Sequence, residues 1–230
     1  TLFSPVRIGT MEIKNRIAMA PMATDFAEGD GTVSQRLIDY YEARARGGVG
    51  LIILEVCTID AMSPYIPRTV GLWDDSFIPG LKRLTDAVHS HGARIIPQIA
   101  HPGPESLAPL FNGTAAVGPS AGIVNNLTRM KCRELSVEDI GAVIGQFGDA
   151  ALRARASGFD GIEFHAAHSY MLAGSFLSAL RSRRTDAYGG GLNGRLRFSL
   201  EAIRAMKEKA GKDFPVTVRL SAEEQVAGGR

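Results

Sequence analysis

One arrangement of hydrophobic and polar positions recurs four times along the chain: an amphipathic segment, then glycine, then a short run rich in valine and isoleucine. Glycine tolerates the left-handed backbone that ends a helix, and an apolar run too short for a helix is typical of a strand buried on both faces. The pattern therefore predicts alternating helices and strands. Together with one earlier apolar run, the expected strands are residues 17–22, 49–56, 94–100, 161–167 and 215–221.

Two of the predicted helices have recognisable starts. Ser136 stands three residues before Asp139, which is the spacing of a capping box, and apolar residues then recur at helical intervals. Ser34 likewise precedes an apolar series that begins at Leu37. A chain that alternates strand and helix in this way predicts a parallel sheet with right-handed crossovers. An open doubly wound sheet and a (β/α)8 barrel both satisfy this order.

Polar or turn-forming residues at the strand ends favour the barrel. They stand at or just past the C-terminal end of each strand in turn: Pro21 and Met22, Glu55, Gln98 and His101, His165 and His168, and Arg219. Contributions from every strand fit the mouth of a barrel better than a crevice at one switch point. The prediction is an α/β fold, a (β/α)8 TIM barrel of which this chain covers roughly the first five β/α units.

The extent of the domain follows from the strand count. Residues 1–230 are expected to form the N-terminal part of one barrel domain. An open five-stranded sheet would expose a hydrophobic edge, so the polypeptide is expected to continue. The long connection over residues 101–136 is rich in Gly, Pro, Asn and Ser, and loops of that length are usually functional. We expect it to shape a substrate pocket.

The densest polar cluster contains His165, His168 and Tyr170. Two imidazoles that donate hydrogen bonds to one ligand oxygen would make an oxyanion-type site, and a nearby phenol could deliver a proton. A zinc site, or buried histidines bonded to the backbone, are the alternatives. Because no cysteine or carboxylate stands at ligand spacing, no metal ligands are expected here.

Gln98 and Arg219 are polar residues inside otherwise apolar strands. Burying a carboxamide or a guanidinium is costly without hydrogen-bond partners, so each implies either a protein network or a ligand. At the same ends of neighbouring strands, the two suit a planar heterocycle on which negative charge develops. The glycine run that follows Arg184 and Asp186 does not come directly after a strand, so a turn is its expected role.

Composition narrows the class of partner. The chain is 45% hydrophobic and 22% charged, which is typical of a globular domain, and its net charge of +2 predicts neither a nucleic acid nor a membrane partner. The longest apolar stretch, residues 48–57, is too short to cross the ~30 Å core of a bilayer. Cys57 and Cys132 make no disulfide framework, so a reducing, cytoplasmic location is expected.

Several segments of the chain match one known family in order. They are Leu2-Phe3-Ser4-Pro5, residues 15–22, residues 98–103, residues 165–172, residues 176–178, residues 184–190 and residues 218–221. This set resembles the old yellow enzyme family of flavin oxidoreductases. The His-Ser-Tyr order at residues 168–170 resembles the branch that contains 2,4-dienoyl-CoA reductase, 2-enoate reductase and trimethylamine dehydrogenase. Departures fall mainly in loops, such as Pro104 where arginine is usual.

The resemblance implies a TIM barrel that carries FMN across its C-terminal mouth. It implies that Pro21, Met22 and Ala23 line the flavin through their backbone, that Gln98 bonds its pyrimidine edge and that Arg219 offsets negative charge on the ring. NAD(P)H would be the electron donor. The larger members of this branch also contain a 4Fe-4S site and FAD, which would lie outside residues 1–230.

The resemblance also implies roles for the catalytic cluster. His165 and His168 would hold the carbonyl oxygen of an enone or enoyl-CoA, and Tyr170 would protonate the α-carbon. The implied activity is reduction of an activated C=C bond, and a homo-oligomer is left open. One alternative is an amine dehydrogenase or demethylase similar to trimethylamine dehydrogenase, and another is a non-catalytic flavin-binding electron-transfer barrel.

Overall fold

A parallel sheet forms the centre of the computed structural model, which describes residues 1–229. Its strands run in the order β10–β9–β6–β4–β3, with β5 paired to β4, and every pairing is parallel. The strands are β3 (Ala18–Met19), β4 (Leu51–Thr58), β5 (Val70–Gly71), β6 (Arg94–Ala100), β9 (Ile162–Ala166) and β10 (Val216–Leu220). All five predicted strands are therefore present.

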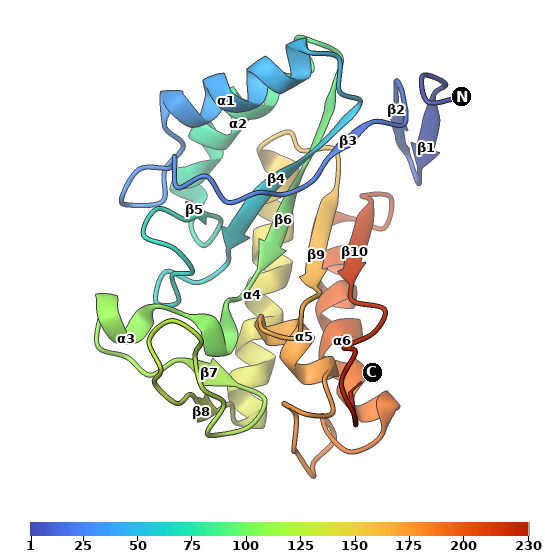
Figure 1. Cartoon of the computed structure of the whole chain (residues 1–230). Helices are drawn as coiled ribbons and strands as arrows, with labels where there is room; N and C mark the ends of the chain where they lie inside the picture. The colour runs from blue at the N-terminus through green and yellow to red at the C-terminus, as the bar shows by residue number, and fades with distance from the viewer. Residues whose placement is uncertain (230) are drawn as a thin grey trace.

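Four long helices cover the sheet (Figure 1). They are α1 (Gln35–Arg46), α2 (Ile78–His89), α4 (Val137–Ala156) and α6 (Leu192–Ala210), and α1 packs against α2 while α4 packs against α6. The predicted helix starts are confirmed. Ser34 accepts a hydrogen bond from the Leu37 amide, and Ser136 forms a complete capping box with Asp139.

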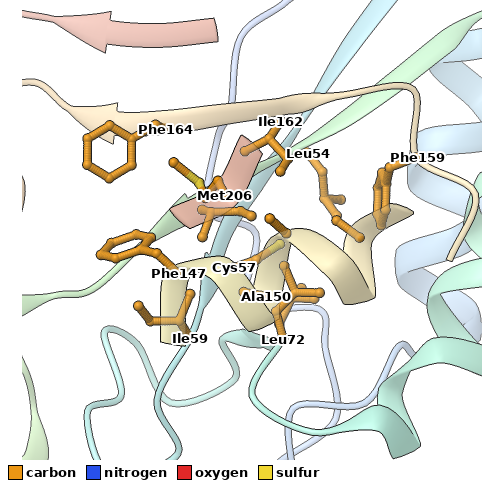
Figure 2. Close-up of a cluster of buried hydrophobic side chains, with 14 of the residues drawn as sticks. Leu54, Cys57, Ile59, Leu72, Phe147, Ala150, Phe159, Ile162, Phe164 and Met206 are labelled. Atoms are coloured by element: carbon orange, nitrogen blue, oxygen red, sulfur yellow. The ribbon is translucent and has the colours of Figure 1, made fainter. Parts of the chain in front are cut away.

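The main core lies between the sheet and these helices. Figure 2 shows Phe147 and Ala150 of α4 facing Ile162 and Phe164 of β9. The rings of Phe147 and Phe164 meet edge to face with their centroids 5.1 Å apart. Since all four of these residues are almost completely buried, the apolar runs read from the sequence are strands covered by helices, as the pattern predicted.

A short hairpin precedes the sheet and was not predicted. It consists of β1 (Val6–Ile8) and β2 (Met11–Ile13), which pair antiparallel. Met11 and Ile13 pack against Leu51 and Ile96, so the hairpin lies near the N-terminal ends of the strands (Figure 1). Strands of three residues are too short to show a periodicity in sequence, which explains why this element was missed.

The opposite end of the sheet is covered by short elements. The segment over residues 101–136 is partly folded, with η2 (Gly103–Glu105), α3 (Ala108–Phe111), β7 (Val117–Gly118) and β8 (Arg133–Glu134). The helix α5 (Leu172–Leu177) follows β9 and lies at the same end (Figure 1). The 3-10 turn η1 (Asp75–Phe77) precedes α2. The Arg184 guanidinium pairs with the Asp186 carboxylate in the turn predicted there.

Candidate active site

Polar side chains from three adjacent strands share one face of the sheet. Arg219 of β10 is opposite His165 of β9, and Gln98 of β6 is opposite Glu163 of β9. Residues opposite each other in a sheet point to the same face, as do residues two apart in one strand. The four side chains therefore gather at the C-terminal end of the sheet.

The three predicted catalytic residues lie together. The ring centroids of His165 and His168 are 5.4 Å apart, those of His168 and Tyr170 are 5.3 Å apart, and those of His165 and Tyr170 are 6.1 Å apart. His168 and Tyr170 are nearly parallel, whereas His165 meets both edge to face. Two imidazoles and a phenol thus surround one small volume.

A strained turn presents His168 and Tyr170. His168 and Ser169 both have a left-handed backbone, with φ of 66° and 57°, which non-glycine residues rarely adopt. The His168 amide donates to Ser221 Oγ at 2.7 Å, and Ser175 Oγ donates to the Ser169 carbonyl at 2.8 Å. Such conformations persist where the surroundings fix them, so Ser221, directly after β10, and Ser175 of α5 together hold this turn.

Burial and positive charge keep both imidazoles neutral. Burial, followed by His168 and the Arg219 charge, lowers the pKa of His165 to about 4. Burial and the Arg219 charge also lower the pKa of His168. His165 Nδ1 is buried and has no hydrogen-bond partner among residues 1–229. Neutral imidazoles at this position can donate hydrogen bonds to a ligand oxygen without bringing a positive charge.

Arg219 supplies the positive charge of the site. Its guanidinium makes no hydrogen bond or ion pair within the described part of the chain. Its charge nevertheless lowers the pKa values of His165 and His168, opposes the raised pKa of Tyr170 and opposes the raised pKa of Glu163. Arg219 is half-buried, so the burial expected from the sequence is only partial, and its guanidinium makes no direct contact with the nearby Glu163. A guanidinium free to make such contacts can bind a ligand that carries negative charge.

Gln98 and Glu163 form a buried pair. Gln98 is 3% exposed, and its Nε2 donates to Glu163 Oε1 at 2.7 Å. Burial raises the pKa of Glu163, and the bond from Gln98 opposes this shift. The sequence prediction missed Glu163, although a charged residue two positions before His165 in a buried strand was a usable signal. The protein network that we considered for Gln98 is present.

The loop after β3 carries Pro21, Met22 and Ala23, and Met22 is 61% exposed. Thr24 anchors the loop, because its Oγ1 donates to Glu55 Oε2 at 2.6 Å and its amide lies 3.2 Å from the same oxygen. The Tyr41 hydroxyl of α1 donates to this carboxylate as well, at 3.1 Å. Glu55 therefore holds the loop rather than facing the cluster of rings.

A cavity of about 310 Å³ adjoins Tyr170. It is lined by Tyr65, Ile66, Glu105, Leu107, Asn126, Leu127 and Tyr170. Four of these residues come from the segment over residues 101–136. The rings of Tyr65 and Tyr170 are 11° from parallel with centroids 6.3 Å apart. Burial raises the pKa of Tyr170, and the neighbouring Tyr65 adds to this, so the phenol keeps its proton at neutral pH.

His101 directly follows β6, as predicted, but its side chain contacts the following segment and Asp60. It is 3% exposed, its Nδ1 accepts from the Gly103 amide at 2.9 Å, and its Nε2 is 3.7 Å from Asp60. These contacts fix the start of the following segment. Tyr65 and Glu105, which sequence reasoning missed, lie beside Tyr170 instead, and no pattern in the sequence marked them.

Two further observations concern the described residues. Among residues 1–229, no group of three or more His, Cys, Asp or Glu side chains is arranged to hold a metal ion. None of the helices over that range has the length and apolar character needed to span a membrane.

Comparison with known proteins identifies the family. The model of the NADH:flavin oxidoreductase / NADH oxidase family matches residues 1–230. The chain belongs to this family. The resemblance to the old yellow enzymes that the motifs indicated is therefore confirmed.

Similar proteins agree with this assignment. The NADH oxidase of Thermoanaerobacter brockii is 48% identical over 229 residues, which are 99% of this chain and 35% of that protein. A 2-naphthoyl-CoA reductase in complex with 2-naphthoyl-CoA has a TM-score of 0.94 at 31% identity, over 100% of this chain and 36% of its own. Histamine dehydrogenase from Rhizobium sp. 4-9 has a TM-score of 0.90 at 32% identity, over 99% of this chain and 33% of its own.

These matches define the fold and its extent. The chain spans about a third of the length of these three proteins. Its parallel sheet is the N-terminal part of a (β/α)8 TIM barrel, as predicted, because the structural neighbours are TIM barrels that contain it.

Proposed function

We propose that this chain is the N-terminal part of the FMN-binding barrel of an oxidoreductase that reduces an activated C=C bond with electrons from NAD(P)H. The substrate class is an α,β-unsaturated carbonyl compound or enoyl-CoA. One observation carries the proposal: His165, His168 and Tyr170 surround one volume beside the unpaired Arg219. Membership of a family of NADH:flavin oxidoreductases supports it.

The residues present fit FMN. The Arg219 guanidinium makes no hydrogen bond or ion pair among residues 1–229, and Met22 and Ala23 are exposed while Pro21 is half-buried. In the proposal these three residues line the flavin, Gln98 meets its pyrimidine edge and Arg219 balances negative charge on the ring. Bound FMN supplies the two-electron chemistry, by accepting hydride from NAD(P)H and giving it to the alkene.

The side chains of the cluster perform the remaining steps. His165 and His168, both neutral, donate hydrogen bonds to the substrate carbonyl oxygen, where negative charge develops as the β-carbon receives hydride. Each such donor can lower the activation barrier by ~3 kcal/mol. Tyr170, whose raised pKa keeps it protonated, gives its proton to the α-carbon. Arg219 stabilises the negative charge that accumulates nearby.

The proposal is tested on the full-length protein that contains this chain. It should be yellow as purified, lose the flavin absorbance under anaerobic NADH or NADPH, and regain it when an enone or enoyl-CoA is added. A protein that takes up no FMN, or whose reduced form none of these compounds reoxidises, contradicts the proposal.

Tyr170→Phe tests the proton donor directly. It should slow reoxidation by the alkene by about 10²- to 10⁴-fold, as expected for loss of a general acid. Tyr188→Phe is the matched control, because it removes a phenol hydroxyl that donates a hydrogen bond to Glu201 Oε2 at 2.7 Å, away from the cluster. If the two variants slow reoxidation equally, Tyr170 is not the proton donor.

Amine oxidation is the second candidate. The near-parallel rings of Tyr65, Tyr170 and His168, with Glu105 beside them, are groups that attract an organic cation. The similarity to a histamine dehydrogenase points the same way. Anaerobic loss of flavin absorbance on addition of an amine, with no reoxidation by enones, would favour this candidate. An oligomer, and the 4Fe-4S and FAD groups of larger relatives, stay predictions.

A further inference from the structure

Glu105 is a buried carboxylate beside the proposed proton donor. It is 8% exposed and lies at the end of η2. Its Oε2 accepts from the Asn126 amide at 2.9 Å, and its Oε1 accepts from Asn126 Nδ2 at 2.8 Å. The Nη1 atom of Arg181 is 3.6 Å from Oε1 and has no hydrogen-bond partner among residues 1–229. Glu105 is thus held in one orientation.

Of the ion pair between Glu105 and Arg181, only Glu105 lines the cavity. Glu105 lines the 310 Å³ cavity together with Tyr170, whereas Arg181 does not. Apart from Asn126, the other walls are aromatic or aliphatic. At Tyr170 the charge of Arg219, which lowers the pKa, has a larger effect than that of Glu105, which raises it, but only Glu105 lines this cavity.

A carboxylate in such a wall affects which ligands enter. Two like charges repel strongly where the surroundings are apolar. The residues that line this cavity include no cation that could pair with an anionic ligand, so desolvating the anion adds to the cost. An uncharged carbonyl meets neither penalty. We propose that Glu105 makes the pocket beside Tyr170 select uncharged α,β-unsaturated esters, thioesters and ketones over free α,β-unsaturated acids. This inference rests on the proposed function.

Binding can be measured without turnover. The full-length protein loaded with FMN is titrated with 3-phenylpropanoate or with its methyl ester, and the change in flavin absorbance gives each Kd. Both probes are saturated and cannot be reduced, and their phenyl group suits the aromatic wall. We expect the acid to bind at least about tenfold more weakly than the ester, a difference of about 1.4 kcal/mol.

Glu105→Gln keeps the size of the side chain and removes its charge. The ratio of the two Kd values should fall toward one, mainly through tighter binding of the acid. Arg181→Gln removes the countercharge and should move the ratio in the opposite direction. Glu134→Gln is the control, because Glu134 is 48% exposed on the same segment and does not line the cavity.

The outcomes separate this inference from the proposed function. Wild-type protein that binds the acid as tightly as the ester overturns the role of Glu105, as does a ratio that Glu105→Gln leaves unchanged. If Glu105→Gln lowers stability, the opposite shift in Arg181→Gln still decides the matter. Protein that binds FMN but neither probe excludes this pocket as the substrate site. Protein that binds no FMN contradicts the proposed function itself.

Discussion

Ser175→Ala should uncouple the strained turn from its support. Ser175 is completely buried on α5, and its Oγ donates to the Ser169 carbonyl at 2.8 Å and lies 3.3 Å from the Tyr170 carbonyl. The left-handed backbone at His168 and Ser169 costs roughly 1–2 kcal/mol per residue. Removing the hydroxyl therefore releases a turn that is unfavourable by itself.

The magnitude follows from these contacts. Loss of a buried hydrogen bond that leaves a carbonyl unsatisfied costs about 1–3 kcal/mol of unfolding free energy. For a domain of 150–250 residues, each kcal/mol lowers Tm by about 2–4 °C. A 1 Å displacement of a catalytic group can cost ~10²-fold in rate. We expect alkene reduction to fall by one to two orders of magnitude (about 10- to 100-fold), with FMN content unchanged.

Thermal unfolding and stopped-flow reoxidation of the full-length protein measure both effects. Ser178→Ala is the matched control, because Ser178 is also completely buried and its Oγ has no hydrogen-bond partner within residues 1–229. The reasoning is refuted if the two variants have the same Tm and the same rate. A lower Tm with an unchanged rate would mean that the turn is structural only.

Three further predictions follow from single contacts. Gly174→Ala should displace the same turn and slow alkene reduction, since its Cβ would lie 2.8 Å from the Ala167 carbonyl oxygen and 3.0 Å from the Ser169 amide; Gly145→Ala, with open space around it, should not. Arg219→Met should lower the flavin midpoint potential by tens of mV, where 30 mV is about 1.4 kcal/mol; an unchanged potential in a redox titration contradicts the charge assignment. His165 has a folded pKa of about 4 against an ordinary 6.5, so the unfolded chain takes up its proton first and stability falls as pH drops from 6.5 to 4. Urea unfolding at pH 6.5 and at pH 4 gives the free energy of unfolding lost between these pH values. His165→Gln should lose about 3 kcal/mol less than wild type, and equal losses would refute the burial argument.

The sequence revealed the strands and the polar residues of the site because each leaves a local signal. A buried strand is an apolar run, and a polar residue inside it, such as Gln98 or His165, is conspicuous. The predicted first strand was too long, since pairing stops at Met19 and Pro21 has no amide hydrogen to donate. The proposed flavin-lining role of Pro21, Met22 and Ala23 was available only through the family resemblance, because backbone contacts have no side-chain signature.

The residues that sequence reasoning missed are brought to the site by tertiary contacts. Tyr65 and Glu105 come from connecting segments, and they reach Tyr170 only because the chain folds over the strand ends. Glu55 was predicted at a strand end, but β4 continues to Thr58, so Glu55 lies within the strand, where the pairing register shifts between Leu54 and Val56. Its carboxylate accepts from Thr24 and from Tyr41, which is on a helix outside the sheet. Which way a charged side chain turns at a strand end depends on packing that no local pattern records.

The bond between Tyr41 and Glu55 connects a helix on the outside of the sheet to the loop that we propose to line the flavin. Tyr41 is completely buried on α1, and its hydroxyl donates to the same Glu55 oxygen that accepts from Thr24, the residue after the loop of Pro21–Ala23. Tyr41→Phe would remove one of the donors to the Glu55 carboxylate. Under the proposed function, flavin affinity should then respond to a change in α1, which supplies none of the proposed flavin contacts. Efforts to stabilise this protein by redesigning its helical shell should keep this tyrosine.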